Sequence, residues 1–227
     1  MQAESFMREF EDGNTLILNG DAPFIDSETI SNALKLHEAE ENAVTVVTAE
    51  LEQPKGYGRI LRSENGLAAI VEEKDATDAQ RAVKEVNSGV YWFRTKALLE
   101  LLGGLSQSNA QGEYYLTDTI GLALVKGWKA DAFQSENPDV ILGANTRKDL
   151  LHLNDIARQR VLDRHMENGV NFVCTDGIII GNDVEIGAET TILPGTILRG
   201  KTKIGSRCTI GPNCLIENCT IGDHVTL

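Results

Sequence analysis

The first 147 residues alternate between short apolar runs and segments whose apolar residues recur at helical spacing. The runs are rich in valine, isoleucine and threonine, which favour strands. Predicted strands cover residues 15–18, 43–51, 59–62, 67–72, 86–93 and 128–133. Predicted helices cover residues 1–11, 27–41, 96–102 and 116–126. This alternation indicates an α/β domain with a mainly parallel sheet.

The first of these strands, Thr15–Leu18, shows no alternation of polar and apolar residues, which is typical of a strand buried on both faces of a parallel sheet. Asn19 and Gly20 then predict a turn, and Asp21 follows. Ligands of open α/β sheets bind beyond the carboxyl ends of the strands, where a carboxylate can hold a divalent metal against a phosphate. On this stretch alone, a simple turn cap explains Asp21 equally well.

A single long helix is predicted from Thr146 to Asn168, and the pair Asn168–Gly169 ends it as a C-terminal cap. We interpret this helix as a connector. The predicted organisation is therefore a first domain over residues 1–147, a linker helix over 148–169 and a repeat domain over 170–227.

The last segment carries an internal repeat of six residues, which predicts a parallel β-helix. At about three faces per coil, we expect fewer than three coils, with an open apolar end. Cys208, Cys214 and Cys219 fit as small stacked residues, because their spacing does not suit a zinc site. The repeated apolar positions are Ile180, Ile186, Ile192, Leu198, Ile204, Ile210, Ile216 and Ile221.

Composition narrows the function classes. The chain has 227 residues, 41% of them apolar, and a net charge of −13, which argues against nucleic acid and anionic membranes as partners. No apolar run reaches the ~18 residues of a membrane span, and no signal peptide opens the sequence. The four cysteines are expected as reduced thiols of a cytoplasmic protein. An anionic substrate would need a local basic group or a metal.

The histidines do not suggest a metal or catalytic site. His37 is predicted on a helix surface, and His152 and His165 as ordinary helix residues without a metal-binding partner. His224 falls in a corner of the repeat, where nothing marks it as a catalyst.

One further loop is a candidate for ligand binding. Gly56 and Gly58 flank Tyr57, which predicts a tight loop whose backbone can approach a flat ligand, although a hairpin turn is the alternative. Glu72 ends one strand and Asn87 enters the next. Taken alone, these two residues suit a solvated charge and a turn cap, respectively.

Six sequence motifs, taken in order and followed by a helix and hexapeptides, resemble one family along essentially the whole chain. This family comprises the bacterial bifunctional enzymes that combine N-acetylglucosamine-1-phosphate uridyltransferase and glucosamine-1-phosphate N-acetyltransferase. The motifs are Asn19-Gly20-Asp21-Ala22-Pro23, Gly56-Tyr57-Gly58-Arg59-Ile60, Ile70-Val71-Glu72-Glu73-Lys74-Asp75-Ala76-Thr77, Glu85-Val86-Asn87-Ser88-Gly89, Asn109-Ala110-Gln111-Gly112-Glu113-Tyr114-Tyr115 and Gly143-Ala144-Asn145-Thr146-Arg147.

The resemblance implies a Rossmann-like nucleotidyltransferase domain of the GT-A type, a linker helix and a short left-handed parallel β-helix that assembles as a homotrimer. The implied reaction makes UDP-N-acetylglucosamine from UTP and N-acetylglucosamine 1-phosphate. Asp21 and Asn145 would then be the Mg²⁺ ligands, and hard oxygen donors suit this ion. Asn19 and Gly20 would lie at the nucleotide and sugar. Gly58, Glu72 and Asn87 would hold the N-acetylglucosamine.

Two departures from the family pattern lead to further expectations. No segment of this sequence matches the family's glycine-rich opening loop, with its arginine and lysine, or the family's first strands. The domain is therefore expected to be truncated at its N-terminus and to have little uridyltransferase activity. The acetyltransferase part is likewise expected to be missing. Two alternatives stay open, namely a non-catalytic scaffold that binds sugar nucleotides or forms trimers, and a related adenylyl- or thymidylyltransferase.

Overall fold

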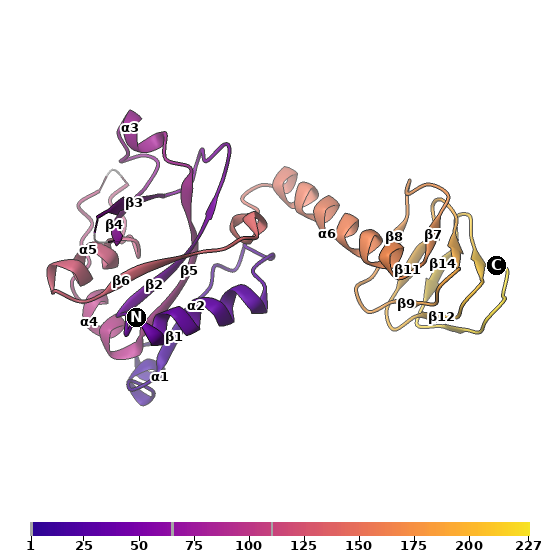
Figure 1. Ribbon diagram of the computed structural model, residues 1–227, viewed down its shortest axis with the longest axis horizontal. Helices are drawn as coiled ribbons and strands as arrows, with labels where there is room; N and C mark the ends of the chain where they lie inside the picture. The colour runs from indigo at the N-terminus through magenta and orange to yellow at the C-terminus, as the bar shows by residue number, and fades with distance from the viewer. Residues whose placement is uncertain (1, 65, 110) are drawn as a thin grey trace. The chain divides into compact units, whose positions relative to one another are not determined.

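The structure is a computed structural model that describes residues 2–64, 66–109 and 111–227 (Figure 1). Met1 of the predicted first helix and Ala110 of the fifth motif lie outside the described residues. The chain divides into two compact units, Met1–Ala144 and Asn145–Leu227, and the long helix belongs to the second. Among the described residues, no helix has both the length and the apolar character to cross a membrane.

A six-stranded sheet forms the centre of the first unit, with the strand order β4-β3-β5-β2-β6 and with β1 beside β5. Of the strand pairs described in this sheet, only β2–β6 is parallel, since β5 runs antiparallel to β1, β2 and β3, and β4 antiparallel to β3. The prediction of a mainly parallel sheet was therefore wrong. The strands are β1 Asn14–Ile17, β2 Val44–Glu50, β3 Arg59–Ser63, β4 Gly66–Val71, β5 Glu85–Arg94 and β6 Ala130–Gln134.

The prediction for β1 was wrong in the same way, because this strand pairs antiparallel with β5 and none of its residues is fully buried. Its apolar residues nevertheless alternate between two cores, as the pleat of a strand requires, with Ile17 packed against one core and Leu16 against the other.

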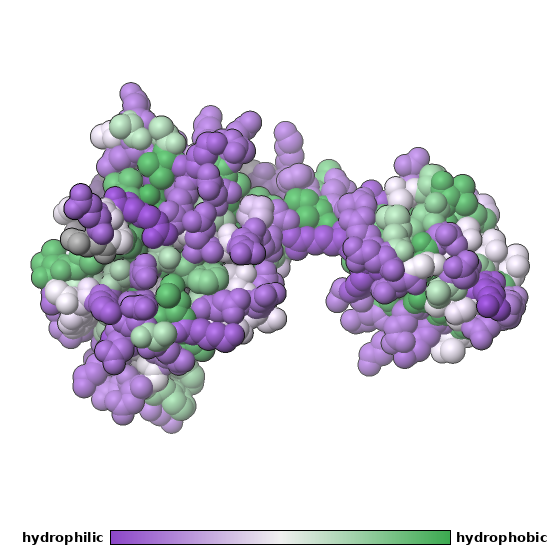
Figure 2. Space-filling view, in the orientation of Figure 1, coloured by the Kyte–Doolittle hydropathy of each residue, from purple (hydrophilic) through white to green (hydrophobic). Residues whose placement is uncertain are grey.

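Helices cover both faces of this sheet and create the two cores. One core joins the sheet to α1, α4 and α5, and the other joins it to α2 and a short 3₁₀ helix, η1. The helices are α1 Glu4–Glu9, α2 Ser27–Ala39, α3 Asp78–Arg81, α4 Thr95–Leu102, α5 Asp118–Val125 and η1 Pro138–Ile141. Polar side chains occupy most of the visible outer surface of each unit (Figure 2).

Two histidines are buried, and the burial of His37 contradicts its predicted place on a helix surface. His37 is 1% exposed because it stands on the same face of α2 as Thr29 and Ala33, the face that covers the sheet. Its Nδ1 lies 3.0 Å from the Thr45 hydroxyl. His165 is 4% exposed. Neither Nε2 atom has a hydrogen-bond partner among the described residues.

The second unit begins with α6, Arg147–Glu167, as the sequence predicts. The Thr146 hydroxyl accepts from the backbone N–H of Asp149, whose carboxylate in turn accepts from the Thr146 N–H, which forms a capping box. Asn168 is the C-cap, and Gly169 follows with a φ of 82°. Leu162 of α6 joins the core of the repeat domain.

The repeat domain is a parallel β-helix with three strands on each of its three faces. Leu198, for example, lies between Ile180 and Ile216, one coil before and one after. The prediction of fewer than three coils was wrong, because Phe172 aligns with Ile192 and starts a coil that the six-residue spacing does not reveal. The strands are β7 Asn171–Phe172, β8 Ile179–Ile180, β9 Glu185–Ile186, β10 Thr191–Ile192, β11 Ile197–Arg199, β12 Lys203–Ile204, β13 Thr209–Ile210, β14 Leu215–Glu217 and β15 Thr220–Ile221.

Candidate functional site

The predicted turn after β1 is exposed and lies against the bulged part of β5. The Asn19 side chain occupies the space that a Cβ atom on Gly89 would need, and Gly89 has a φ of 77°. Only glycine satisfies both conditions at this position. Gly20 is exposed, and a Cβ atom added to it would meet no described atom within 4 Å. The backbone of this turn is therefore open to a ligand at Gly20.

Asp21 ends this turn, and its carboxylate is exposed. Its backbone carbonyl accepts a hydrogen bond of 3.1 Å from the Ala144 N–H. A Cβ atom on Gly143 would lie 3.4 Å from the same carbonyl and 3.7 Å from the Asp21 carboxylate. The structure thus places residues 143 and 144 beside Asp21, and Asn145 follows as the first residue of the second unit.

Three of the predicted ligand-binding residues meet at one place on the sheet. The Asn87 N–H donates to the Gly58 carbonyl at 2.9 Å. A Cβ atom on Gly58 would lie 3.3 Å from both carboxylate oxygens of Glu72, so this carboxylate sits directly over the Gly58 backbone. Asn87 belongs to β5, Gly58 directly precedes β3 and Glu72 directly follows β4. The pairing of these strands brings together residues that are far apart in the sequence.

Burial and neighbouring acids control the ionisation of Glu72. Burial raises the pKa of this carboxyl group, the hydrogen bond from Thr117 opposes the shift, and the charges of Asp75 and Asp118 raise the pKa further. The Thr117 hydroxyl donates to Glu72 Oε1 at 3.1 Å. The second oxygen, Oε2, receives no such bond from the described residues and can accept a hydrogen bond from a ligand.

Sequence reasoning missed Thr117, Tyr91 and Tyr115 as neighbours of this site. Tyr91 is 2% exposed, and burial raises the pKa of its hydroxyl. Burial and the charges of nearby acids, Glu72 among them, raise the pKa of the Tyr115 hydroxyl. Tyr115 stands in the fifth motif, which was the available signal, whereas Tyr91 has the pattern of an ordinary apolar strand residue.

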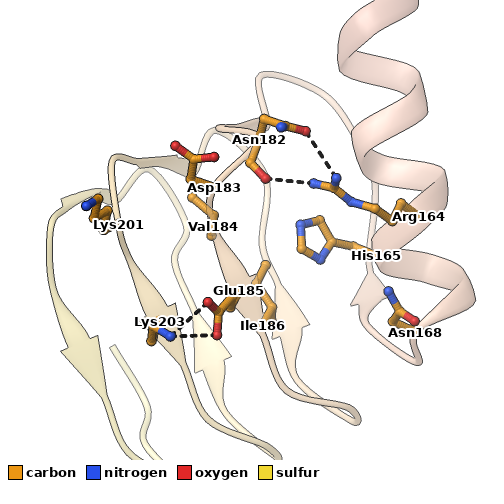
Figure 3. A pocket seen from close by; sticks show the side chains of 10 residues that line it. All are labelled: Arg164, His165, Asn168, Asn182, Asp183, Val184, Glu185, Ile186, Lys201 and Lys203. Atoms are coloured by element: carbon orange, nitrogen blue, oxygen red, sulfur yellow. Dashed lines mark hydrogen bonds and ion pairs between the residues drawn. The ribbon is translucent and has the colours of Figure 1, made fainter. Parts of the chain in front are cut away.

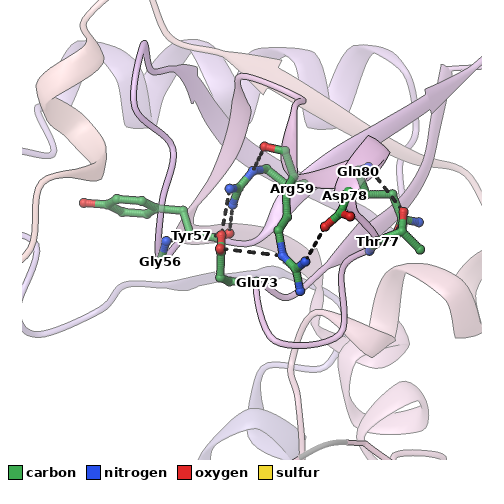
Figure 4. A network of polar contacts seen from close by, with 8 residues as sticks. Gly56, Tyr57, Arg59, Glu73, Thr77, Asp78 and Gln80 are labelled. Atoms are coloured by element: carbon green, nitrogen blue, oxygen red, sulfur yellow. Dashed lines mark hydrogen bonds and ion pairs between the residues drawn. The ribbon is translucent and has the colours of Figure 1, made fainter.

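A buried arginine fastens the loop that carries Gly58 (Figure 4). Arg59 is 2% exposed, and its guanidinium donates to the Tyr57 carbonyl and to the Glu73 carboxylate, the latter at 2.7 Å. Glu73 also accepts from the Gly56 N–H at 3.2 Å. These bonds hold both sides of the glycine loop and fix Glu73, the residue after Glu72. The hydrogen bonds from Arg59 and Gly56 lower the pKa of Glu73, which keeps it charged as the partner of Arg59.

Few of the described residues could serve as ligands of a metal ion. Among the described residues, no group of three or more histidine, cysteine, aspartate or glutamate side chains is arranged to hold a metal ion. The four cysteines are free thiols. A magnesium ion bound here would rely on the Asp21 carboxylate, an amide oxygen and substrate phosphates, which is a usual ligand set for Mg²⁺.

A hollow of about 650 Å³ lies in the second unit, between the C-terminal turn of α6 and strands β9 and β12 (Figure 3). Three of its charged side chains are bonded to other residues of its lining. Arg164 donates to the side-chain and backbone oxygens of Asn182, at 3.1 and 3.0 Å, and Lys203 pairs with Glu185 at 2.8 Å. None of the residues predicted to bind substrate lines this hollow.

Comparison with known proteins finds a family model for a part of each unit. A model described as nucleotidyl transferase matches residues 1–140. A second, described as bacterial transferase hexapeptide (six repeats), matches residues 183–218.

Similar proteins carry one shared name. The bifunctional protein GlmU of Acetivibrio thermocellus is 46% identical over 226 residues, which is 99% of this chain and 49% of that protein. The bifunctional protein GlmU of Thermoanaerobacter pseudethanolicus is 45% identical over 224 residues, which is 98% of this chain and 48% of that protein. The chain therefore spans about half the length of these relatives.

A solved structure shares the fold. It is described as a putative glucose-1-phosphate thymidylyltransferase from Bacillus anthracis, with a TM-score of 0.52 and 18% identity, and the match covers 69% of this chain and 58% of that one. At this identity the likeness concerns the fold alone. Because the first family model covers more than half of the sequence, the chain belongs to the nucleotidyl transferase family.

Proposed function

We propose that this chain serves uridyl transfer from UTP to N-acetylglucosamine 1-phosphate, which gives UDP-N-acetylglucosamine. The observation that carries the proposal is the convergence of Gly58, Glu72 and Asn87, which were selected from separate motifs and lie at one place on the sheet. Family membership and the relatives named bifunctional protein GlmU support the same reaction.

The residue types suit the chemistry of nucleotidyl transfer, which depends on positioning and charge neutralisation more than on covalent catalysis. Glu72 offers an acceptor oxygen to the sugar, and Gly58 lets the sugar approach the backbone. Asn19 and Gly20 form the turn that we assign to the nucleotide and sugar side. The prediction that the 227-residue chain has little turnover by itself stays a prediction, so binding is the more direct readout.

We further propose Asp21 and Asn145 as the ligands of a magnesium ion. Support for Asp21 comes from its exposed carboxylate at the end of the turn after β1. Support for Asn145 comes from its place directly after Ala144, whose N–H is bonded to Asp21. When bound, Mg²⁺ supplies positive charge to the phosphates.

We also propose that the repeat domain, as a left-handed β-helix, forms a homotrimer, and that the protein works in the cytoplasm. An apolar ladder supports the assembly, since Ile179, Ile197 and Leu215 stack on the outer side of one face. Leu215 is 66% exposed and Ile179 is 45% exposed. Exposed apolar patches of this kind mark interaction surfaces. Free thiols support the location.

Calorimetric titration tests the sugar assignment. With Mg²⁺ present, the chain is expected to bind UDP-N-acetylglucosamine more tightly than UDP-glucose. Glu72→Gln is expected to weaken binding of the first ligand by about tenfold, because a hydrogen bond to a charged group contributes about 1.5 kcal/mol. Glu9→Gln, a matched change of an exposed glutamate in α1, should leave binding unchanged. Equal affinity for the two ligands, or binding of neither, would contradict the proposal.

A further inference from the structure

The hollow between α6 and strands β9 and β12 gathers positive charge in an acidic protein. Its lining carries three basic side chains and two acidic ones, namely Arg164, Lys201, Lys203, Asp183 and Glu185. The whole chain, by contrast, has 21 lysine and arginine residues against 34 aspartate and glutamate residues. A local excess of positive charge favours an anionic ligand at this place.

The charge of Arg164 is not balanced by a carboxylate. Its guanidinium donates to the side-chain oxygen of Asn182 at 3.1 Å and to the backbone oxygen of the same residue at 3.0 Å, and both acceptors are neutral. Lys203, in contrast, pairs with Glu185 at 2.8 Å. In the part of the chain that the structure describes, no ion pair joins Arg164 or Lys201 to a carboxylate. Asn182 thus holds the guanidinium in place while its other N–H groups can donate to a ligand.

His165 gives a second, independent indication of a ligand. It is 4% exposed, and its Nε2 atom is buried with no hydrogen-bond partner among the described residues. Its ring extends from α6 toward the strands that line the hollow (Figure 3). Burial and the charge of Arg164 lower the pKa of His165, so the ring is neutral at neutral pH. With its hydrogen on Nε2, a neutral ring can donate one hydrogen bond to an anion beside Arg164.

The rest of the lining fits a molecule larger than a bare ion. The volume of about 650 Å³ lies in the range of small-molecule sites. Val184 and Ile186 make a part of the lining apolar. The exposed Asp183 makes no ion pair among the described residues, so its carboxylate can accept hydrogen bonds from hydroxyl groups. An anionic end and a hydroxylated body would satisfy both kinds of group.

We propose that this hollow binds the phosphate monoester of a small hydroxylated molecule. Arg164 and His165 donate to the phosphate from α6, and Lys201 adds positive charge from the side of the hollow away from this helix (Figure 3). A phosphate suits these donors better than a carboxylate does, because it offers three strong acceptor oxygens and a charge of about −1.5 to −2. The site is independent of the proposed uridyl transfer, since none of the residues assigned to that reaction lines it.

Nuclear magnetic resonance of the 227-residue chain tests the site, with glycerol 3-phosphate as the probe. Titration should shift the imidazole Nε2 signal of His165. The signal of His152, an exposed residue of α6 outside the hollow, should stay unchanged. His165→Phe keeps an aromatic ring but removes both nitrogens, and it should weaken binding by about three- to tenfold.

A pair of arginines on α6 supplies matched variants. Arg164→Gln should weaken binding by about tenfold or more, because charge-assisted hydrogen bonds to the phosphate are lost. Arg158 also donates to a backbone carbonyl, that of Thr175 at 3.0 Å, but does not line the hollow. Arg158→Gln should therefore keep the affinity within about twofold of the parent. Lys201→Gln changes an exposed side chain, so it should leave the fold intact and weaken binding by about threefold.

The probes and variants give clear contrary results. An unshifted His165 signal at millimolar glycerol 3-phosphate would overturn the proposal, as would parent affinity in both Arg164→Gln and Lys201→Gln. Acetate that binds as tightly as glycerol 3-phosphate would overturn the choice of a phosphate. Inorganic phosphate that binds as tightly would overturn the organic body of the ligand. Each of these results concerns the second unit alone and leaves the proposed uridyl transfer standing.

Discussion

His37 shows how burial changes the chemistry of a single residue. Burial lowers the pKa of His37 to about 4, and the charge of Arg94 acts in the same direction. Thr45 contacts Nδ1, and Nε2 has no hydrogen-bond partner among the described residues, so a proton on Nε2 would have no acceptor among them. The folded state therefore holds this histidine neutral.

This burial predicts a pH dependence of stability. The pKa of His37 is 6.5 in the unfolded chain and about 4 in the folded chain. At a pH between these two values, His37 is protonated in the unfolded chain and neutral in the folded chain. The contribution of neutral His37 to the free energy of unfolding should therefore be complete above pH 6.5 and should decline by up to ~3 kcal/mol as the pH falls toward 4. Urea unfolding at about pH 7 and about pH 5 measures this decline.

The variant His37→Phe isolates this contribution from that of the carboxylates. Both tryptophans, Trp92 and Trp128, lie in the first unit, so their fluorescence follows the unit that contains His37. The variant should lose less stability than the parent over the same fall in pH. His152→Phe, a change of an exposed residue in the second unit, serves as the control. Identical pH dependence in the parent and His37→Phe would refute the argument.

The candidate site shows which residues a sequence can reveal. Glu72 and Asn87 could be selected because their motifs resemble those of a known family, and Asp21 because it follows a strand and a turn. His37 and Tyr91 could not be placed, because their environments depend on which helix face or strand neighbour lies opposite. That information belongs to packing and is absent from local spacing.

At the scale of elements, the space available for a side chain at each corner of the β-helix depends on the neighbouring coil. Gly187, Gly205 and Gly222 occupy the same corner in three successive coils, each directly after an isoleucine of the β9–β12–β15 face. A Cβ atom on Gly187 would lie 2.6 Å from the Ser206 backbone nitrogen, and one on Gly205 would lie 2.7 Å from that of Asp223. On Gly222, it would meet none of the described atoms within 4 Å.

The same alanine substitution should therefore have different effects in different coils. Gly187→Ala should destabilise the β-helix by about 1–3 kcal/mol, because a backbone atom of the next coil must move. Gly222→Ala is the matched control and should change stability by less than about 0.5 kcal/mol. Hydrogen exchange of residues 171–227 followed by mass spectrometry measures both. Equal protection in the two variants would contradict the role assigned to stacking.

The comparison of predicted and observed elements shows a similar limit. The predicted strands and helices lie close to the observed ones, since apolar periodicity and capping residues such as Thr146 are local signals, whereas the short helices α3 and η1 were not predicted. Strand direction is not local. β5 enters between β1 and β2 in the opposite sense, and its apolar run has the same pattern in either direction.

At the scale of the whole molecule, the sequence shows a change from alternating elements to a six-residue repeat. The number of coils was not evident from it, because Phe172 precedes Ile180 by eight residues and breaks the spacing that identifies the repeat. The structure recovers this coil through pairing across the stack. Three coils meet the usual minimum for a stable repeat domain.

The three faces of the β-helix differ in what they present to the outside. The β7–β10–β13 face carries Asn171, Thr191 and Thr209 at its outward positions. The β9–β12–β15 face carries Glu185, Lys203 and Thr220, with the first two joined as an ion pair. Of these three described faces, only β8–β11–β14 presents apolar side chains at all three outward positions. If copies of this chain associate through the β-helix, this face is the one whose burial releases the most apolar surface.

The proposed trimer can be tested on this face. The parent chain should sediment with a mass three times its own 24.8 kDa. Leu215→Lys places a charge in the apolar ladder, and burying an unpaired charge costs several kcal/mol, so the variant should sediment as a monomer. Thr209→Lys makes the same change on a polar face and should leave the trimer intact. A monomeric parent at micromolar concentration, or a Leu215→Lys variant that remains trimeric, would show that this ladder does not hold the subunits together.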